Sequence, residues 1–184
     1  MAVLGKPAFT AADYLAWEAE QTDKHEYFAG DVFAMVGAGD AHVTISLNVA
    51  AALHAHLRGK PCRTYIADMK VRLAIAGKPV FYYPDMVAVC DPTDREPYFI
   101  AAPCLIVEVL SESTERIDRR EKFLSYQTLP SLQAYWLVAQ DASRVEVFRR
   151  CHDWQPEYFT SGEIPVDCLE HSITVEAIHR DIEE

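Results

Sequence analysis

The sequence lacks the features of a membrane or exported protein. It has no apolar run near the roughly 18 to 20 residues that a membrane-spanning helix needs, and its first residues show no basic segment followed by a signal-type apolar core. We therefore expect a soluble protein of the cytoplasm. The sequence also has no internal repeat and no low-complexity linker. At 184 residues and 50% hydrophobic content, it is long enough for one well-packed core, so we predict a single domain over residues 1–184.

Cysteine is present, but not in the spacing of a metal site. The chain has five cysteines, an odd number, and they do not form the closely spaced pairs that bind zinc. Cys90 and Cys104 lie within short apolar segments that have the character of buried strands. We therefore predict that the cysteines are reduced and serve as small core residues.

Basic residues are in short supply. Asp and Glu number 28 against 17 Lys and Arg, which gives a formal net charge of −11 and argues against a phosphate-rich partner. The excess is concentrated in an acidic C-terminal segment, residues 151–184, which has nine acidic residues and one basic residue. The rest of the chain has 19 acidic and 16 basic residues and is almost neutral. We expect the acidic C-terminal segment to pack on the same domain or to extend it.

Two basic clusters could still contact phosphate locally. One lies within residues 116–122 and the other within residues 70–78. The solvated face of a helix explains the first cluster equally well, so both interpretations stay open.

The spacing of apolar residues predicts alternating helices and strands. A short helix capped by Thr10 precedes a hairpin over residues 24–35, and this hairpin carries Glu26. Further helices are predicted over residues 40–57 and 115–128. Strands are predicted over residues 63–73, 80–90, 104–110, 134–139 and 144–149, with a final strand and a short helix near residues 172–178. This order predicts an α/β fold in which a mixed sheet is flanked by helices.

Two carboxylates interrupt the most apolar strands. Asp85 and Glu108 each lie in a short β-branched segment, where an uncompensated carboxylate costs several kcal/mol to bury. Because the two strands are predicted neighbours, the carboxylates can converge and hold a hard divalent cation through oxygen ligands. The bland interpretation of Glu26 is a surface glutamate. Core or capping roles are favoured over metal ligation for the histidines of the helix over residues 40–57, which are His42, His54 and His56.

These residues together resemble the putative restriction endonuclease family, a group within the PD-(D/E)XK nuclease superfamily. The resemblance spans about residues 9–175 and rests on motifs in their order: Glu26 to Asp31, Tyr83-Pro84-Asp85, Glu108-Val109-Leu110-Ser111, the helix with Asp118 and Lys122, and Tyr135-Trp136-Leu137-Val138. It implies a restriction endonuclease-like core with an N-terminal helix and hairpin.

The resemblance also implies an activity and its residues. Asp85 and Glu108 become metal ligands, and Glu26 joins them directly or through water. The implied reaction is Mg²⁺-dependent hydrolysis of DNA phosphodiester bonds, with Mn²⁺ as a substitute metal. A homodimer is expected by analogy, because duplex cleavage needs two sites.

The lysine of the motif is displaced. The superfamily expects it two positions after the second acid, where this sequence has Leu110. Lys122 can reach back from the following helix, as migrated lysines do in some related nucleases, and Lys70 can reach across from a neighbouring strand. Lys122 is the preferred candidate. The alternative role of Lys122 is a surface ion pair with Asp118, four residues earlier on the same helix face.

Two other functions remain open on the same residues. A catalytically inactive nucleic-acid or protein-interaction module on a nuclease-like scaffold would keep Asp85 and Glu108 as structural remnants. A metal-dependent hydrolase of another small phosphoester would use the same carboxylate pair.

Overall fold

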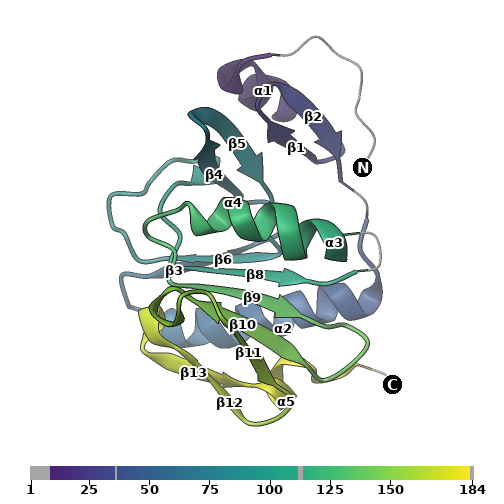
Figure 1. Cartoon of the computed structure of the whole chain (residues 1–184), viewed down its shortest axis with the longest axis vertical. Helices are drawn as coiled ribbons and strands as arrows, with labels where there is room; N and C mark the ends of the chain where they lie inside the picture. The colour runs from purple at the N-terminus through teal and green to yellow at the C-terminus, as the bar shows by residue number, and fades with distance from the viewer. Residues whose placement is uncertain (1–8, 36, 112–113, 183–184) are drawn as a thin grey trace.

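The fold contains two large sheets and a small hairpin (Figure 1). The structure is a computed structural model that describes residues 9–35, 37–111 and 114–182. The five-stranded sheet has the order β2 (Asp31–Ala34), β1 (His25–Phe28), β5 (Lys78–Tyr82), β4 (Lys70–Ile75), β7 (Phe99–Ile100). The six-stranded sheet has the order β11 (Pro156–Phe159), β10 (Val145–Arg149), β9 (Ala134–Val138), β8 (Leu105–Val109), β6 (Met86–Val89), β3 (Arg63–Ile66). Parallel and antiparallel pairs coexist in both sheets, which confirms the predicted mixed α/β architecture.

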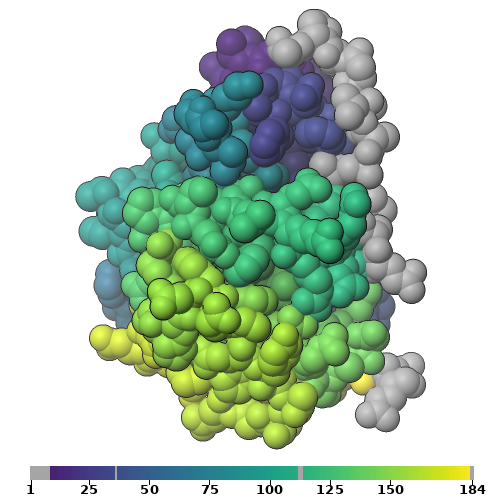
Figure 2. Space-filling view, viewed as in Figure 1, coloured from purple at the N-terminus to yellow at the C-terminus, as the bar shows by residue number. Residues whose placement is uncertain are grey.

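Helices cover both faces of the six-stranded sheet. Helix α2 (Asp40–Leu57) packs on one face. On the other face lie α3 (Glu115–Ile117), a π-helical turn (Asp118–Lys122) and α4 (Phe123–Gln127), which follow one another without a break and are called the α3–α4 segment below. Figure 2 shows this segment, in green, covering the middle of the visible face. Within the described part of the chain, none of the helices combines the length and apolarity needed to cross a membrane.

Side-chain alternation decides which face each strand residue meets. Val107 of β8 joins the core on the α2 side, whereas its neighbour Ile106 joins the core that contains Tyr126 of α4. Glu108 and Leu110 share the parity of Ile106. Both therefore face the α3–α4 segment.

An N-terminal layer packs on the five-stranded sheet. Helix α1 (Ala11–Glu18) begins at a capping box, in which the Thr10 hydroxyl accepts from the Asp13 amide and the Asp13 carboxylate accepts from the Thr10 amide. The helix buries Tyr14 against Tyr27 and Phe81. The expected N-terminal helix and hairpin are therefore present, with Thr10 as the cap.

Two strands that the sequence predicts as continuous are each divided between the two large sheets. Residues 63–73 form β3 and β4, and residues 80–90 form β5 and β6. The two breaks lie side by side, because the Ala67 amide donates to the Asp85 carbonyl over 3.1 Å. The continuous-strand prediction was wrong because apolar residues continue on both sides of each corner, so the sequence pattern does not reveal the change of sheet. Asp85 lies directly at one of these corners.

The acidic C-terminal segment is packed into the same body. Its strand β11 extends the six-stranded sheet, while β12 (Glu163–Val166), β13 (His171–Thr174) and α5 (Val175–Ile178) form the layer next to α2. Ile164, Ile173 and Ile178 are buried in the core that α2 shares. Glu183 and Glu184 of this segment lie outside the described residues.

The cysteines differ from the prediction. Cys62 and Cys90 form a disulfide across a sequence separation of 28 residues, while Cys104, Cys151 and Cys168 are free. Cys62 precedes β3 and Cys90 follows β6, and the register pairs Arg63 with Val89, so the two cysteines lie opposite each other on adjacent strands. The sequence could not predict this pair because it does not show the strand register. Cys151 is exposed and so is not a core residue either.

The disulfide leads to a thiol-counting prediction. Denatured, unreduced protein should react with a thiol reagent at the three free cysteines, and reduced protein at all five. Reduction should also lower the free energy of unfolding by about 2–4 kcal/mol, because the crosslink restricts the unfolded chain. Mass spectrometry after alkylation and urea denaturation measure the two effects. Cys151→Ser is the control, since it removes one thiol without affecting the crosslink. Five reactive thiols before reduction would contradict the assignment.

Candidate active site

Asp85 and Glu108 meet at one end of the six-stranded sheet. Asp85 directly precedes β6, and β6 runs antiparallel to β8, with Met86 opposite Val107. The Asp85 carboxylate accepts a hydrogen bond from the Val109 amide at 2.7 Å, and the Asp85 amide donates to the Glu108 carboxylate at 3.3 Å. The start of one strand is thus tied to the end of the other, which brings the two carboxylates together.

Glu108 is buried beneath the α3–α4 segment. Its side chain is only 3% exposed. One carboxylate oxygen lies 3.2 Å from the Lys122 amine and accepts from the Tyr126 hydroxyl, also over 3.2 Å. These contacts follow from the strand parity, because Glu108 and Leu110 point at the helical residues that cover this face. Position 110 of the strand is a leucine, and the ammonium that contacts Glu108 comes from the helix opposite.

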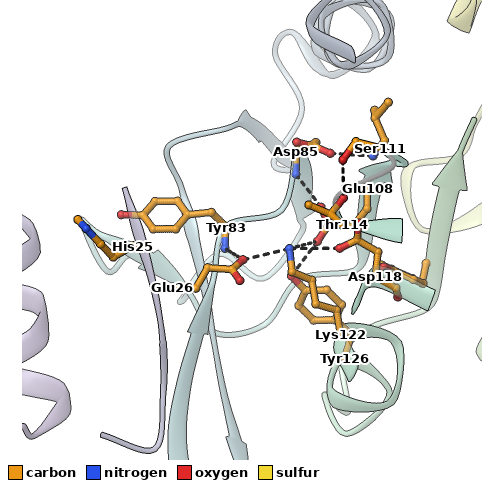
Figure 3. Close-up of polar contacts among 12 residues, drawn as sticks. His25, Glu26, Tyr83, Asp85, Glu108, Ser111, Thr114, Asp118, Lys122 and Tyr126 are labelled. Atoms are coloured by element: carbon orange, nitrogen blue, oxygen red, sulfur yellow. Dashed lines mark hydrogen bonds and ion pairs between the residues drawn. The ribbon is translucent and has the colours of Figure 1, made fainter. Parts of the chain in front are cut away.

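The Lys122 ammonium stands among three carboxylates (Figure 3). Its Nζ atom lies 3.0 Å from Glu26, 3.2 Å from Glu108 and 3.4 Å from Asp118. Both Lys122 and Asp118 are buried, so the interpretation of their contact as a surface ion pair was wrong. The contact was underestimated because helical spacing shows that two residues share a face but not that the face is covered.

A π turn positions this lysine. Residues 118–122 form the π-helical turn between α3 and α4, within what the sequence predicts as one regular helix. π turns are rare and occur most often as single turns inside α-helices, frequently at functional sites. Asp118 and Lys122 are the buried residues of this turn, so both side chains are on its covered face.

Glu26 reaches the cluster from the other large sheet. Tyr27 of β1 packs toward α1, and the alternation of the strand turns Glu26 to the opposite side. There its carboxylate contacts Lys122 and accepts from the Tyr83 amide over 3.2 Å. Glu26 is 3% exposed, so its interpretation as a surface glutamate was wrong.

The electrostatics of the cluster are unbalanced. Three carboxylates, those of Glu26, Glu108 and Asp118, surround the one ammonium of Lys122, and Asp85 is bonded to Glu108 through its amide. Burial raises the pKa of Glu108 well above its usual value. Lys122 lowers this pKa in part, whereas the neighbouring carboxylates raise it further. Burial alone would lower the pKa of Lys122, but Glu108, Glu26 and Asp118 outweigh it and raise this pKa well above its usual value. Lys122 therefore keeps its proton in the presence of these carboxylates.

Lys70, the other candidate lysine, lies elsewhere. Val71 packs into the core that contains Tyr126, so Lys70, one residue earlier on β4, points to the opposite face of its sheet. There its Nζ atom lies 4.8 Å above the Tyr83 ring. Burial lowers the pKa of Lys70, which Glu18 partly opposes. The geometry thus places Lys122, not Lys70, among the carboxylates.

Sequence reasoning missed two residues that contact the cluster. His42, near the start of α2, lies with Nε2 2.8 Å from the Asp85 carboxylate, although core or capping roles were favoured for it. Nothing in its local sequence distinguishes it from His54 on the same helix. Tyr126 lies in the helix predicted over residues 115–128 and was not singled out there, but its hydroxyl donates to Glu108.

A cleft opens beside Asp85. It has a volume of about 460 Å³, and its lining includes Lys24, His42, Ser46, Tyr83 and Asp85. The Asp85 side chain is 22% exposed, whereas those of Glu108 and Lys122 are largely covered. A molecule in the cleft can therefore contact Asp85 directly, whereas Glu108 and Lys122 lie behind it.

The donor set fits a hard divalent cation, with one correction. Asp85 and Glu108 offer oxygen donors, which Mg²⁺ prefers, and the surplus negative charge favours a bound cation. Among the described residues, no group of three or more His, Cys, Asp or Glu side chains is arranged to hold a metal ion. The predicted set of three ligands is thus not preformed: Glu26 is paired with Lys122, and Asp85 and Glu108 are the two residues that would hold a cation.

Comparison with known proteins assigns the chain to a family. Residues 11–176 match the Uma2 family, which is described as "Putative restriction endonuclease". The chain belongs to this family. Two uncharacterized proteins of Synechocystis sp. (strain ATCC 27184 / PCC 6803 / Kazusa) are also similar to it. One is 36% identical over 178 residues, covering 95% of this chain and 93% of its own length. The other is 33% identical over 158 residues, covering 84% and 88%.

A solved structure shows the same fold. The crystal structure of a protein described as a putative nuclease from Anabaena variabilis ATCC 29413 superposes with a TM-score of 0.72. The match covers 91% of this chain and 96% of that one at 18% identity. The nuclease-like fold that the sequence predicted is thereby confirmed.

Removing the buried ammonium should destabilise the protein. Lys122→Met leaves Glu26, Glu108 and Asp118 buried without a counter-charge, so we expect the free energy of unfolding at neutral pH to fall by about 3–5 kcal/mol. Urea denaturation measures the loss. Lys78→Met, at an exposed lysine, is the matched control and should change little. Equal stability of the two variants would show that Lys122 does not hold the cluster together.

The stability of Lys122→Met should depend on pH with a defined sign. Burial raises the pKa of Glu108 and Asp118 in the folded protein above their unfolded values, so the folded state binds protons more tightly than the unfolded state. The free energy of unfolding should therefore rise as the pH falls from neutrality toward the unfolded values. Urea titrations across this range should show that the difference in the free energy of unfolding between wild type and Lys122→Met becomes smaller as the pH falls. A deficit that grows on acidification would contradict this assignment.

Proposed function

We propose that this protein is a metal-dependent endonuclease that hydrolyses phosphodiester bonds in DNA. The observation that supports the proposal most strongly is the position of Lys122, whose ammonium lies 3.2 Å from Glu108. In this proposal Lys122 replaces the lysine that the motif would have at position 110, where this chain has a leucine. Membership of the putative restriction endonuclease family and the fold shared with a putative nuclease support the same reaction class.

Each residue of the cluster has a separate task in this proposal. Asp85 and Glu108 would hold Mg²⁺ or Mn²⁺, which supplies Lewis acidity toward the phosphate and the attacking water. Lys122 keeps its proton because its pKa is raised, and its charge stabilises the negative charge that develops on the phosphate. Glu26 and Asp118 hold the lysine amine in place from two sides. The Tyr126 hydroxyl donates to Glu108 and fixes that carboxylate.

The cleft defines how a substrate would approach. A backbone phosphate in the cleft would reach Asp85 first, because Asp85 is the exposed edge of the cluster. Lys24, on the cleft wall, is paired with Asp68, which offsets its charge. Positive potential at this edge of the cleft therefore depends mainly on the bound cation and on the buried lysine behind it.

Substitution of the cluster tests the proposal. Asp85→Ala, Glu108→Ala and Lys122→Met should each reduce Mg²⁺- or Mn²⁺-dependent nicking of plasmid DNA by about 100-fold or more, because metal ligation or charge stabilisation is lost. Lys70→Met is the matched control, since Lys70 lies on the other face of its sheet, and should retain activity. Folding of every variant is checked by circular dichroism. Wild-type-like nicking by the carboxylate variants, or no nicking by pure wild type with any divalent metal, would reject the proposal.

The competing functions give different results in the same assay. A catalytically inactive module predicts salt-sensitive DNA binding that persists in EDTA, with no cleavage. A hydrolase of another small phosphoester predicts metal-dependent turnover of a chromogenic phosphodiester without plasmid nicking. The homodimer stays a prediction, and light scattering of the purified protein measures it directly.

A further inference from the structure

The start of helix α2 faces the candidate metal-binding residue Asp85. His42 is the third residue of this helix, and its side chain lines the cleft together with Asp85. The distance from His42 Nε2 to Asp85 Oδ1 is 2.8 Å, which is a normal hydrogen-bond length. The side chains are 13% and 22% exposed, so the contact is largely shielded from competing water.

The chemistry of the pair fixes the direction of the bond. An ionised carboxylate only accepts hydrogen bonds, so Nε2 of His42 must carry the proton. The second carboxylate oxygen, Oδ2, accepts from the Val109 amide at 2.7 Å. Each oxygen of Asp85 thus accepts a hydrogen bond, Oδ1 from α2 on one side and Oδ2 from β8 on the other. An ionised carboxylate has about four lone-pair sites, so these two bonds do not by themselves prevent it from binding a cation.

The other ring nitrogen of His42 gives the imidazole no competing anchor. Nδ1 is buried and has no hydrogen-bond partner in the part of the chain that the structure describes. Among the residues that the structure describes, the imidazole ring of His42 is therefore hydrogen-bonded to Asp85. A histidine that served as a helix cap or a core filler would not need its proton placed on this carboxylate.

We propose that His42 is a positioning residue that orients the Asp85 carboxylate for cation binding. It acts through Asp85 and does not itself ligate the metal, because its Nε2 atom is already bound to Oδ1. Donors that orient a ligating carboxylate typically contribute about 10–100-fold to metal affinity. The inference rests on the proposed function only in treating Asp85 as a metal ligand.

Direct metal titration tests this role without relying on cleavage. Mn²⁺ is titrated into the full-length purified chain by isothermal titration calorimetry. His42→Phe keeps a ring of similar shape but removes the donor, and should weaken Mn²⁺ binding by about 10–100-fold. His42→Gln keeps a side-chain N–H donor and should retain most of the affinity. His54→Phe is the matched control, because His54 is exposed on the same helix, and should bind as wild type does.

The outcomes separate this inference from the proposed nuclease activity. Wild-type affinity in His42→Phe overturns the positioning role, whatever the cleavage assay shows. Equal weakening in His42→Phe and His42→Gln also overturns it, because the donor would then not matter. If wild type binds Mn²⁺ and His42→Phe binds it weakly, but neither cuts DNA, the positioning role stands and the nuclease proposal fails. No Mn²⁺ binding by wild type overturns the positioning role. Circular dichroism confirms folding, and His42→Ala replaces His42→Phe if the latter does not fold.

Discussion

The two large sheets and the α3–α4 segment meet at the buried ammonium of Lys122. It joins Glu26 from the five-stranded sheet, Glu108 from the six-stranded sheet and Asp118 from its own π turn. Buried charges are tolerated only when they are closely paired, so these groups fix the distance between the two sheets and the α3–α4 segment. The same contact that orders the core also orders the candidate site. Structure and chemistry therefore share one group of residues.

The passage of the chain between the sheets explains why the site lies where it does. Both corners, at residues 67–69 and 83–85, lie together, and Asp85 is the last residue before the chain enters β6. At this corner Asp85 accepts a hydrogen bond from the Val109 amide of a neighbouring strand and still lines the cleft. Glu108, one strand away, is buried instead. The two carboxylates thus differ in their access to solvent. Asp85 lines the cleft, and Glu108 is buried against Lys122.

Much of this site follows from the sequence because charge is costly in an apolar strand. Asp85 and Glu108 stand out for that reason, and the missing lysine at Leu110 directs attention to Lys122. The sequence does not show the roles of His42 and Tyr126, because a histidine or tyrosine is common in helices and only the partner across space defines its role. The Cys62–Cys90 disulfide and the divided strands were missed for a related reason. Register and sheet membership depend on pairing between distant segments, which local periodicity does not encode.

The π turn has a consequence for the gene that encodes this protein. Its hydrogen bonds close over five residues where those of an α-helix close over four, so it contains one residue more than the α turn that would replace it. That difference is a single codon. Loss of one of the three codons between Asp118 and Lys122 would let the wide turn close into an α turn and would change the spacing of these two residues from four to three. The number of residues in this turn, as well as their identity, therefore sets how Asp118 and Lys122 face each other.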